Sequence, residues 1–286
     1  MVTANKALIS SCGTELAAIA EKNDVTLAFE ASVAGGIPII KSIKEGLAAN
    51  KILSIKGIMN GTCNYILTQM EQQRKDFKTA LSEAQKLGYA EADPSFDIDG
   101  IDTAHKLSIL TSLGFSCPID IGSIYVEGIR NITLADIDYV SELGYKIKLL
   151  GISTLKGKNE YEQRVHPCLV PNNSILANVD GVTNGILVDC DSLGKMFFEG
   201  AGAGSNPTAS AVVADIIDIA RENKTLPFNI PVKNLQKIKA RKISSHKGQY
   251  YFRVAVSDKS GVVAAITSIL RDQEISILSL LQKPKK

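Results

Sequence analysis

The stretch ILSIKGIMNGTCNYILTQMEQQ, residues 52–73, decides the fold class of this chain. Its first part, ILSIKGIM, is mostly apolar, which is typical of a buried strand. The remainder predicts a helix that is entered through Asn60, Gly61 and Thr62. A strand that passes directly into a helix indicates an α/β arrangement.

The same alternation is found on both sides of this stretch. Residues 25–29 predict another buried strand, and DFKTALSEAQKLGYA predicts an amphipathic helix that ends at Gly88. A further helix is predicted from apolar residues at helical spacing and a C-terminal stop: Ile39, Ile40, Ile43, Leu47 and Asn50.

The second half of the chain predicts a sheet and two more helices. Residues 120–200 are rich in β-branched residues and turns, which favours a sheet. SNPTASAVVADIIDIAREN returns to a helix, with Pro207 in its first turn and apolar residues spaced for burial. After a boundary at 222–247, the last segment predicts a strand, a turn, a helix and a strand. We therefore expect an α/β fold whose α+β central part has a mixed sheet and helices.

The composition is that of an ordinary soluble globular protein. The chain has 286 residues, 45% of them hydrophobic and 22% charged, enough for one large domain or two smaller ones. A net charge of +2 argues against a general attraction to nucleic acid or membranes. No apolar run approaches the roughly eighteen residues of a membrane span. The start has no apolar signal core, so secretion is not expected.

The cysteines indicate no metal site. They lie far apart and form no C-x-x-C pair: Cys12, Cys63, Cys117, Cys168 and Cys190. The histidines beside them are His105, His166 and His246, so neither a zinc site nor a disulfide framework is predicted. A reduced, cytoplasmic compartment fits this usage best.

The segment EADPSFDIDGIDTAHK, residues 91–106, concentrates carboxylates before a lysine: Glu91, Asp93, Asp97, Asp99 and Asp102, then Lys106. A helix–loop–helix calcium site needs an acid at its first position, glycine at its sixth and glutamate at its twelfth. Placing Gly100 sixth puts Ser95 first and Lys106 twelfth. A cation cannot replace the bidentate carboxylate, so the sequence excludes a calcium loop.

Two interpretations of this segment remain open on spacing alone. The favoured one is a solvated acidic loop with Asp102 and Lys106 as an ordinary i,i+4 ion pair. The other is a proton-donating lysine held by carboxylates beside a buried helix. Asp99 would share the face of Lys106 if the helix began at Asp99.

Several stretches together resemble the homoserine dehydrogenase family. They come in the family's order and span about residues 1–220: VTANKA at 2–7, FEASVAGGIPII at 29–40, GIMNGTCNYIL at 57–67, GYAEADPSFDIDGIDTAHK at 88–106 and GAGAGSNPTASAV at 200–212. The family interconverts aspartate 4-semialdehyde and L-homoserine with NAD(P)H, on the route to threonine and methionine. The resemblance therefore implies an oxidoreductase that binds an amino-acid substrate.

The resemblance implies a role for each matching polar residue. Lys106 stands at the position of the catalytic lysine, which exchanges a proton with the substrate oxygen, and Asp102 orients it. Lys6 matches a second lysine near substrate and nicotinamide. Glu91 matches the carboxylate that binds the substrate's amino group, and Asp97 belongs to the same set. Further substrate-lining positions fall on Gly61, Thr62 and Tyr89.

The resemblance also implies a cofactor contact and a cation site. GAGAG lacks the third glycine of the dinucleotide fingerprint, because Ser205 stands there. In the family this turn lies beside the nicotinamide, which makes Gly202 and Gly204 cofactor neighbours. The loop FEASVAGGI matches a monovalent cation site, usually described with sodium, with oxygen from the Glu30 side chain and three main-chain carbonyls: Val33, Gly35 and Ile37.

The expected organisation has four parts. They are the end of a dinucleotide-binding domain (1–28), a substrate-binding, catalytic and dimerisation domain (29–222), a linker (223–247) and a partial ACT-like βαβ module (248–286). No G-x-G-x-x-G occurs, so most of the dinucleotide-binding domain is expected to be absent. This favours, as an alternative, a non-catalytic amino-acid-binding or regulatory fragment. In either case we expect a homodimer or tetramer.

Overall fold

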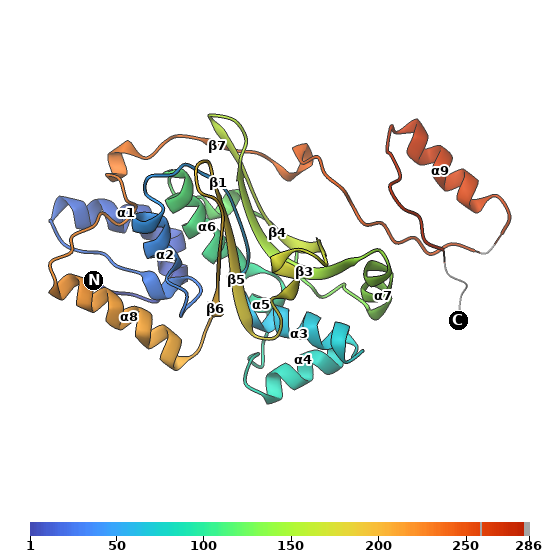
Figure 1. The fold of residues 1–286 in the computed structure, drawn as a ribbon, viewed down its shortest axis with the longest axis horizontal. Coiled ribbons are helices and arrows are strands. Elements are labelled where there is room, and N and C mark those ends of the chain that lie inside the picture. The colour runs from blue at the N-terminus through green and yellow to red at the C-terminus, as the bar shows by residue number, and fades with distance from the viewer. Residues whose placement is uncertain (258, 283–286) are drawn as a thin grey trace.

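The structure is a computed structural model that describes residues 1–257 and 259–282. Within these residues one mixed, seven-stranded sheet occupies the centre (Figure 1). Its strands are β1 (Ile52–Ile58), β2 (Tyr125–Val126), β3 (Tyr145–Leu155), β4 (Glu160–Pro171), β5 (Thr183–Cys190), β6 (Gly194–Ala201) and β7 (Lys239–Ala240). Both the α/β class and the sheet expected in residues 120–200 are confirmed.

The strand predicted from the opening stretch, β1, lies in the middle of the sheet. The strand order is β2-β4-β3-β1-β5-β6, and β7 also pairs with β4. β1 is antiparallel to β3 on one side and to β5 on the other. β2 and β7 run parallel to β4, which makes the sheet mixed.

Helices surround this sheet, and those predicted at residues 39–50, 61–73, 76–88 and 205–223 and in the last segment all form, whereas α7 (Leu134–Glu142) lies within the region predicted as sheet. The α-helices are α1 (Lys6–Lys22), α2 (Ile39–Lys41), α3 (Gly61–Gln72), α4 (Phe77–Lys86), α5 (Ser95–Ile98), α6 (Ile101–Phe115), α7 (Leu134–Glu142), α8 (Ser205–Ala220) and α9 (Val262–Asp272). Shorter helical turns are η1 (Glu30–Ser32), η2 (Ser42–Gly46), η3 (Ile121–Ser123), η4 (Ile175–Asn178), η5 (Val232–Asn234) and η6 (Ile243–Ser245).

The two faces of the sheet are buried in different ways. Because side chains alternate along a strand, Leu149 of β3 belongs to the large core shared with α6, whereas Leu150 belongs to a smaller cluster. That smaller cluster lies under η4 and includes Leu176 and Val179. The hydrophobic core therefore lies mainly on the side of α6.

The strand predicted at residues 25–29 does not form. This segment runs beside the first residues of the chain and makes one parallel bridge, between Val2 and Ala28. A strand needs a ladder of hydrogen bonds, and the described residues supply no second neighbour for it. The prediction was wrong for this reason.

α8 is less buried than the spacing of its apolar residues predicted. Pro207 stands in its first turn as predicted, but of its residues only Ala211 and Asp215 are buried. Its larger apolar residues lie on the surface, with exposed fractions of 38–50%: Val213, Ile216, Ile217 and Ile219. No other described element covers that side of the helix, which is why spacing alone mispredicted burial.

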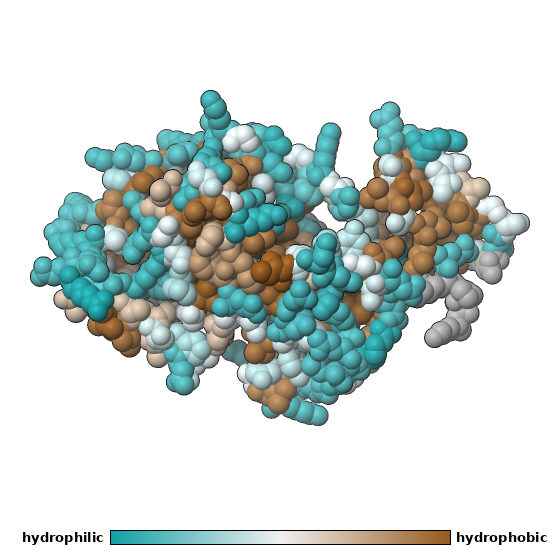
Figure 2. Space-filling view, in the orientation of Figure 1, coloured by the Kyte–Doolittle hydropathy of each residue, from teal (hydrophilic) through white to brown (hydrophobic). Residues whose placement is uncertain are grey.

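The last segment forms the predicted helix but not the predicted strands. α9 lies to one side of the main body (Figure 1), and no ladder forms in the described residues before or after it. Figure 2 shows hydrophobic surface gathered over this part. A contact of Arg253 and Tyr251 with Asp136 of α7 joins it to the body. The segments on either side of α9 stay outside any sheet, because a helix alone offers them no strand with which to pair.

The region predicted as a linker carries some structure of its own. Within residues 223–247, η5 and η6 form, and β7 pairs with Glu160 and Tyr161 of β4. Among the described residues, no helix is long and apolar enough to cross a membrane.

Candidate active site

The acidic segment folds into two short elements joined by a glycine. α5 ends at Ile98, and Gly100 has a φ of 84°, a left-handed conformation that suits glycine. α6 then begins at Ile101, not at Asp99. Asp99 caps α5 and pairs with Arg130 at the surface, so it does not share the face of Lys106. The condition under which Asp99 would share that face is therefore not met.

Asp102 lies between two lysines. Its Oδ2 is 2.7 Å from the Nζ of Lys106, and its Oδ1 is 3.1 Å from the Nζ of Lys6. The Nζ of Lys106 also donates to the Met59 carbonyl at 2.7 Å. The i,i+4 ion pair is therefore present but buried, with side-chain exposures of 10% and 4% for Lys106 and Asp102. The solvated-loop interpretation does not hold for this pair.

Asn60 joins the lysine pair to a second carboxylate. Its amide donates to Asp97 Oδ1 at 2.7 Å and to Asp102 Oδ2 at 2.9 Å. Its own Oδ1 accepts from Cys63 N–H and so caps α3. The Thr62 hydroxyl lies 2.6 Å from the Tyr89 carbonyl and 3.2 Å from Asp97 Oδ2. One amide therefore holds two like charges side by side.

The pKa values of the Asp102 and Asp97 carboxylates are shifted in opposite directions. Burial would raise the pKa of Asp102, but the ammonium groups of Lys106 and Lys6 outweigh it and lower the pKa to about 2. Burial raises the pKa of Asp97, and the hydrogen bonds from Asn60 and Thr62 only partly offset this. Asp97 is thus the carboxylate that would gain most from another cation.

Lys6 reaches the cluster from a separate part of the chain. It opens α1, whose N-terminus is capped by the Asn5 side chain accepting from Leu8 N–H. Its Nζ lies 5.6 Å from the centre of the Phe96 ring, a cation–π distance. Its side chain is 34% exposed, so it lies at the open side of the cluster.

Two predicted substrate residues, Tyr89 and Glu91, lie at the solvent-exposed rim of the cluster. Tyr89 is 42% exposed and its ring packs edge-on against Tyr65, 5.1 Å away. Glu91 is exposed, and its carbonyl accepts from the Gln85 amide. Among the described residues, the Glu91 carboxylate joins none of the hydrogen bonds of the cluster. The structure thus brings together Lys6, Asp97, Asp102 and Lys106 and leaves Glu91 outside.

The glycine turn after β6 lies against a buried amide. A Cβ at Gly202 would fall 2.0 Å from Nδ2 of Asn184, so only glycine fits there. Asn184 is 1% exposed, and neither polar atom of its side chain has a partner among the described residues. Gly204 has a φ of 117° and precedes α8. The sheet places Asn184 next to the end of β1, because Gly185 pairs with Ile58.

The predicted cation loop folds tightly beside this turn. The Glu30 carboxylate is buried and accepts from Ile40 N–H at 2.9 Å and Lys41 N–H at 2.8 Å, which caps α2. Burial raises its pKa to about 7 despite these two hydrogen bonds. Gly35 lies against Gly202, whose carbonyl would be 2.8 Å from a Cβ at Gly35.

The loop supplies oxygen donors rather than a cluster of acids. Among the described residues no group of three or more acidic, histidine or cysteine side chains could hold a metal. A carboxylate and main-chain carbonyls are oxygen donors of the kind that a hard monovalent cation accepts. The carbonyl of Ile37 also accepts from Ile39 N–H at 2.7 Å.

Three groups of the site were missed by sequence reasoning: the Asn60 side chain, the Met59 carbonyl and Asn184. Asn60 was seen only as a helix entrance, although a capping residue beside matching family motifs was a usable signal. The Met59 carbonyl and Asn184 become visible only when β1, α6 and β5 are placed together.

The fold and the cluster define an α/β protein with a lysine–carboxylate centre where the central strand β1 ends and α3 begins. The family model for homoserine dehydrogenase matches residues 38–217. A homoserine dehydrogenase of Neisseria gonorrhoeae is 48% identical over 99% of this chain and 66% of its own length. The corresponding values for one of Pseudomonas aeruginosa are 46%, 99% and 66%. This chain belongs to the homoserine dehydrogenase family.

Solved structures agree. A crystal structure of a homoserine dehydrogenase from Thiobacillus denitrificans superposes with a TM-score of 0.90 at 45% identity, over 99% of this chain and 66% of that one. A hyperthermophilic archaeal homoserine dehydrogenase in complex with NADPH gives 0.68 at 32% identity, over 79% of this chain and 65% of that one. The chain spans just under two thirds of the length of these relatives.

Proposed function

We propose that this chain is the substrate-binding and catalytic part of a homoserine dehydrogenase. The proposed reaction is the NAD(P)H-dependent interconversion of aspartate 4-semialdehyde and L-homoserine, in threonine and methionine biosynthesis. The observation that supports it is the Asp102 carboxylate held between Lys106 and Lys6. Negative charge grows on the aldehyde oxygen during reduction, and two ammonium groups fixed at one point would stabilise that charge.

Lys106 is the proposed proton donor. The Asp102 carboxylate and the Met59 carbonyl each hold its Nζ at 2.7 Å, which fixes the direction of the ammonium group. In reduction it gives a proton to the substrate oxygen, and in the reverse direction it takes one from the hydroxyl. Lys6, on the open side, is the proposed second contact to that oxygen and to the nicotinamide.

The substrate's ammonium group is assigned to the acidic side of the cluster. Asp97 is partly buried, and its raised pKa means that its charge is not fully compensated, which suits a cationic partner. Glu91 at the rim is the second proposed contact, which the side chain would make by turning inward. Gly61, Thr62 and Tyr89 are the proposed lining.

NAD(P)H supplies the hydride when it is bound. The residues proposed to contact its nicotinamide end are Lys6, Gly202 and Gly204. The glycine turn suits a flat ring, because no side chain projects from Gly202 and the unpartnered Asn184 amide lies directly against it. The 286-residue sequence has no G-x-G-x-x-G. We therefore expect this polypeptide to bind NAD(P)H weakly by itself.

The loop at residues 30–37 is the proposed sodium site, with the Glu30 side chain and the carbonyls of Val33, Gly35 and Ile37 as ligands. A cation there would offset the burial of the Glu30 carboxylate and would stiffen the loop that packs on Gly202. Its proposed role is structural, and no proton or hydride passes through it.

We also propose a homodimer or tetramer in the cytoplasm. The exposed apolar residues of α8 and the edge strand β6 offer surface for association, including Val213, Ile216 and Met196. Five free cysteines accord with a reducing compartment. Light scattering on the purified chain measures the oligomeric state.

The deciding experiment measures NAD(P)H-dependent reduction of aspartate 4-semialdehyde. It compares the 286-residue polypeptide with one fused at its start to the dinucleotide-binding domain of a relative. We expect turnover from the fused protein and little from the unfused one. Homoserine binding without turnover in both would instead favour a non-catalytic amino-acid-binding protein.

A further inference from the structure

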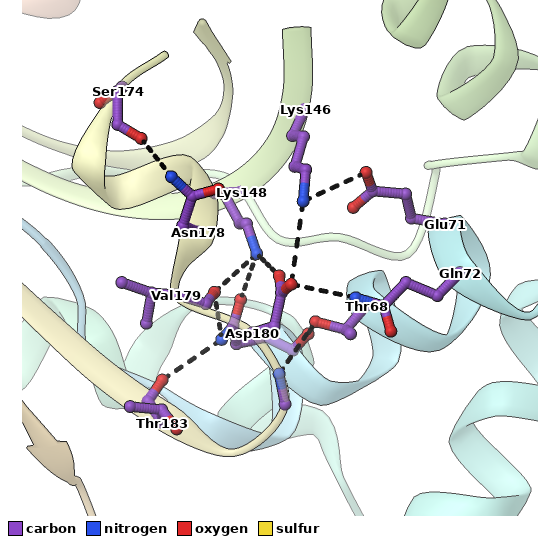
Figure 3. Close-up of polar contacts among 12 residues, drawn as sticks. Thr68, Glu71, Gln72, Lys146, Lys148, Ser174, Asn178, Val179, Asp180 and Thr183 are labelled. Atoms are coloured by element: carbon purple, nitrogen blue, oxygen red, sulfur yellow. Dashed lines mark hydrogen bonds and ion pairs between the residues drawn. The ribbon is translucent and has the colours of Figure 1, made fainter. Parts of the chain in front are cut away.

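A second lysine is buried outside the catalytic cluster. Lys148 of β3 is 1% exposed, and its Nζ donates to Val179 O and Asp180 Oδ1, both at 2.7 Å (Figure 3). The same Nζ also donates to Asn64 Oδ1 at 3.2 Å. Burial of a charge is costly unless it is paired and fully hydrogen-bonded, and here three acceptors converge on one ammonium. The mechanism proposed above makes no use of this group.

The acceptors of Lys148 lie on two segments that it ties together. Asn64 belongs to α3, residues 179–182 form the turn before β5, and Thr183 is the first residue of β5. With its oxygen turned to Lys148, the Asn64 amide donates to Val179 O at 3.0 Å and to Thr183 O at 3.2 Å. One turn further on, the Thr68 hydroxyl accepts from Gly181 N–H at 3.1 Å. Lys148 is thus the centre of a clamp between α3 and this turn.

The clamp acts on the end of α3 that carries the site. Asn64 N–H bonds to the carbonyl of Asn60, whose amide holds Asp97 and Asp102. Gly61 lies so close to the clamped turn that a Cβ would be 2.7 Å from Val182 O. Lys148 is therefore connected to the turn Asn60-Gly61-Thr62 in two ways. One connection runs through the hydrogen bonds of α3, and the other through the packing of Val182 against Gly61.

We propose that Lys148 is a positioning residue for the substrate turn Asn60-Gly61-Thr62. It touches neither substrate nor cofactor, and it acts by fixing the distance of α3 from residues 179–183. The proposal rests on the proposed function, because that function makes this turn a substrate contact.

Lys146 provides a matched control. It lies two residues earlier on β3, faces the same side, and approaches Asp180 at 3.8 Å and Glu71 at 3.5 Å (Figure 3). Its side chain is 20% exposed and makes no contact with Asn64 or Val179 among the described residues. Lys146→Met removes a charge from the same strand without opening the clamp.

The test measures L-homoserine binding by calorimetry on the whole chain, for Lys148→Met and Lys146→Met. We expect Lys148→Met to weaken binding about tenfold or more, since small misplacements of substrate contacts are costly, and Lys146→Met to stay within about twofold. Hydrogen exchange of the amides of residues 61–66 gives a second readout. It should accelerate in Lys148→Met alone, relative to amides of α8.

Equal homoserine binding and equal exchange in both variants would overturn the proposal. If Lys148→Met does not fold, Asp180→Asn decides, because Asp180 is 31% exposed and tolerates substitution better. Weaker homoserine binding in Asp180→Asn supports the clamp, and unchanged binding overturns it. A parent chain that binds no homoserine refutes the proposed function instead, and the exchange of residues 61–66 then decides the role of Lys148.

Discussion

The Nζ of Lys106 lies 2.7 Å from Oδ2 of Asp102, one helical turn earlier, and both side chains are buried. The same oxygen accepts from Asn60, while the other oxygen faces Lys6. The Asp102 carboxylate therefore orients Lys106 and holds Lys6 beside it.

Replacing Lys106 should remove the chemistry more than the fold. Lys106→Ala takes away the proposed proton donor, for which we expect a loss of about 10²–10⁴ in turnover of the fused protein. Lys6 still faces Asp102, so the carboxylate keeps one cation. Steady-state rates and circular dichroism measure the two effects. Lys224→Ala, at an exposed lysine paired with Asp24, is the control, and near-normal turnover in Lys106→Ala would refute the assignment.

Acid should weaken the folded state through Asp102. Its folded-state pKa of about 2 lies below its ordinary value of 3.8. Its contribution is therefore complete above about pH 4 and is lost as the pH falls toward 2, a change of about 2 kcal/mol. Urea unfolding between pH 5 and pH 2.5 measures it. Asp102→Asn should show a flatter dependence than the parent chain, and identical slopes would contradict this prediction.

Gly202→Ala should destabilise the chain because the new Cβ would lie 2.0 Å from the Asn184 amide. Overlap of this kind costs about 1–3 kcal/mol. Asn184→Gly should restore most of the loss in the double variant, since it removes the overlapping group. Thermal unfolding measures all three proteins. Gly46→Ala is the control, because a Cβ at Gly46 meets nothing within 4 Å. A double variant that is no more stable than Gly202→Ala would place the strain elsewhere.

Sodium should raise the thermal stability of the chain if the Glu30 loop binds it. We expect a higher Tm in sodium chloride than in N-methylglucamine chloride at equal ionic strength, because a bound cation stabilises the folded state alone. Glu30→Gln should abolish the difference. Asp218→Asn, which alters a nearby acid paired with Lys41, should retain it. Equal Tm values in both salts would argue against the cation.

Local patterns were sufficient for the central elements. The β1–α3 unit follows from residues 52–73 alone, because strand propensity and helix entry are properties of neighbouring residues. The helices ending near Gly88 and beginning near Pro207 follow for the same reason. The predictions failed for elements that depend on a partner strand. Residues 25–29 and the segments around α9 have strand-like sequences, but among residues 1–257 and 259–282 they join no sheet.

The sequence by itself determined the α/β class, the order of the central elements and the lysines and carboxylates of the candidate site. Spacing placed Asp102 one helical turn from Lys106, and the family motifs added Lys6 and Asp97. Tertiary structure alone decided that the pair is buried, that Asn60 and the Met59 carbonyl complete it, and that Asp99 faces away. The physical reason is that hydrogen-bond distance and desolvation depend on segments far apart in the chain. Lys6 and Asp102 are 3.1 Å apart only because α1 and α6 pack together.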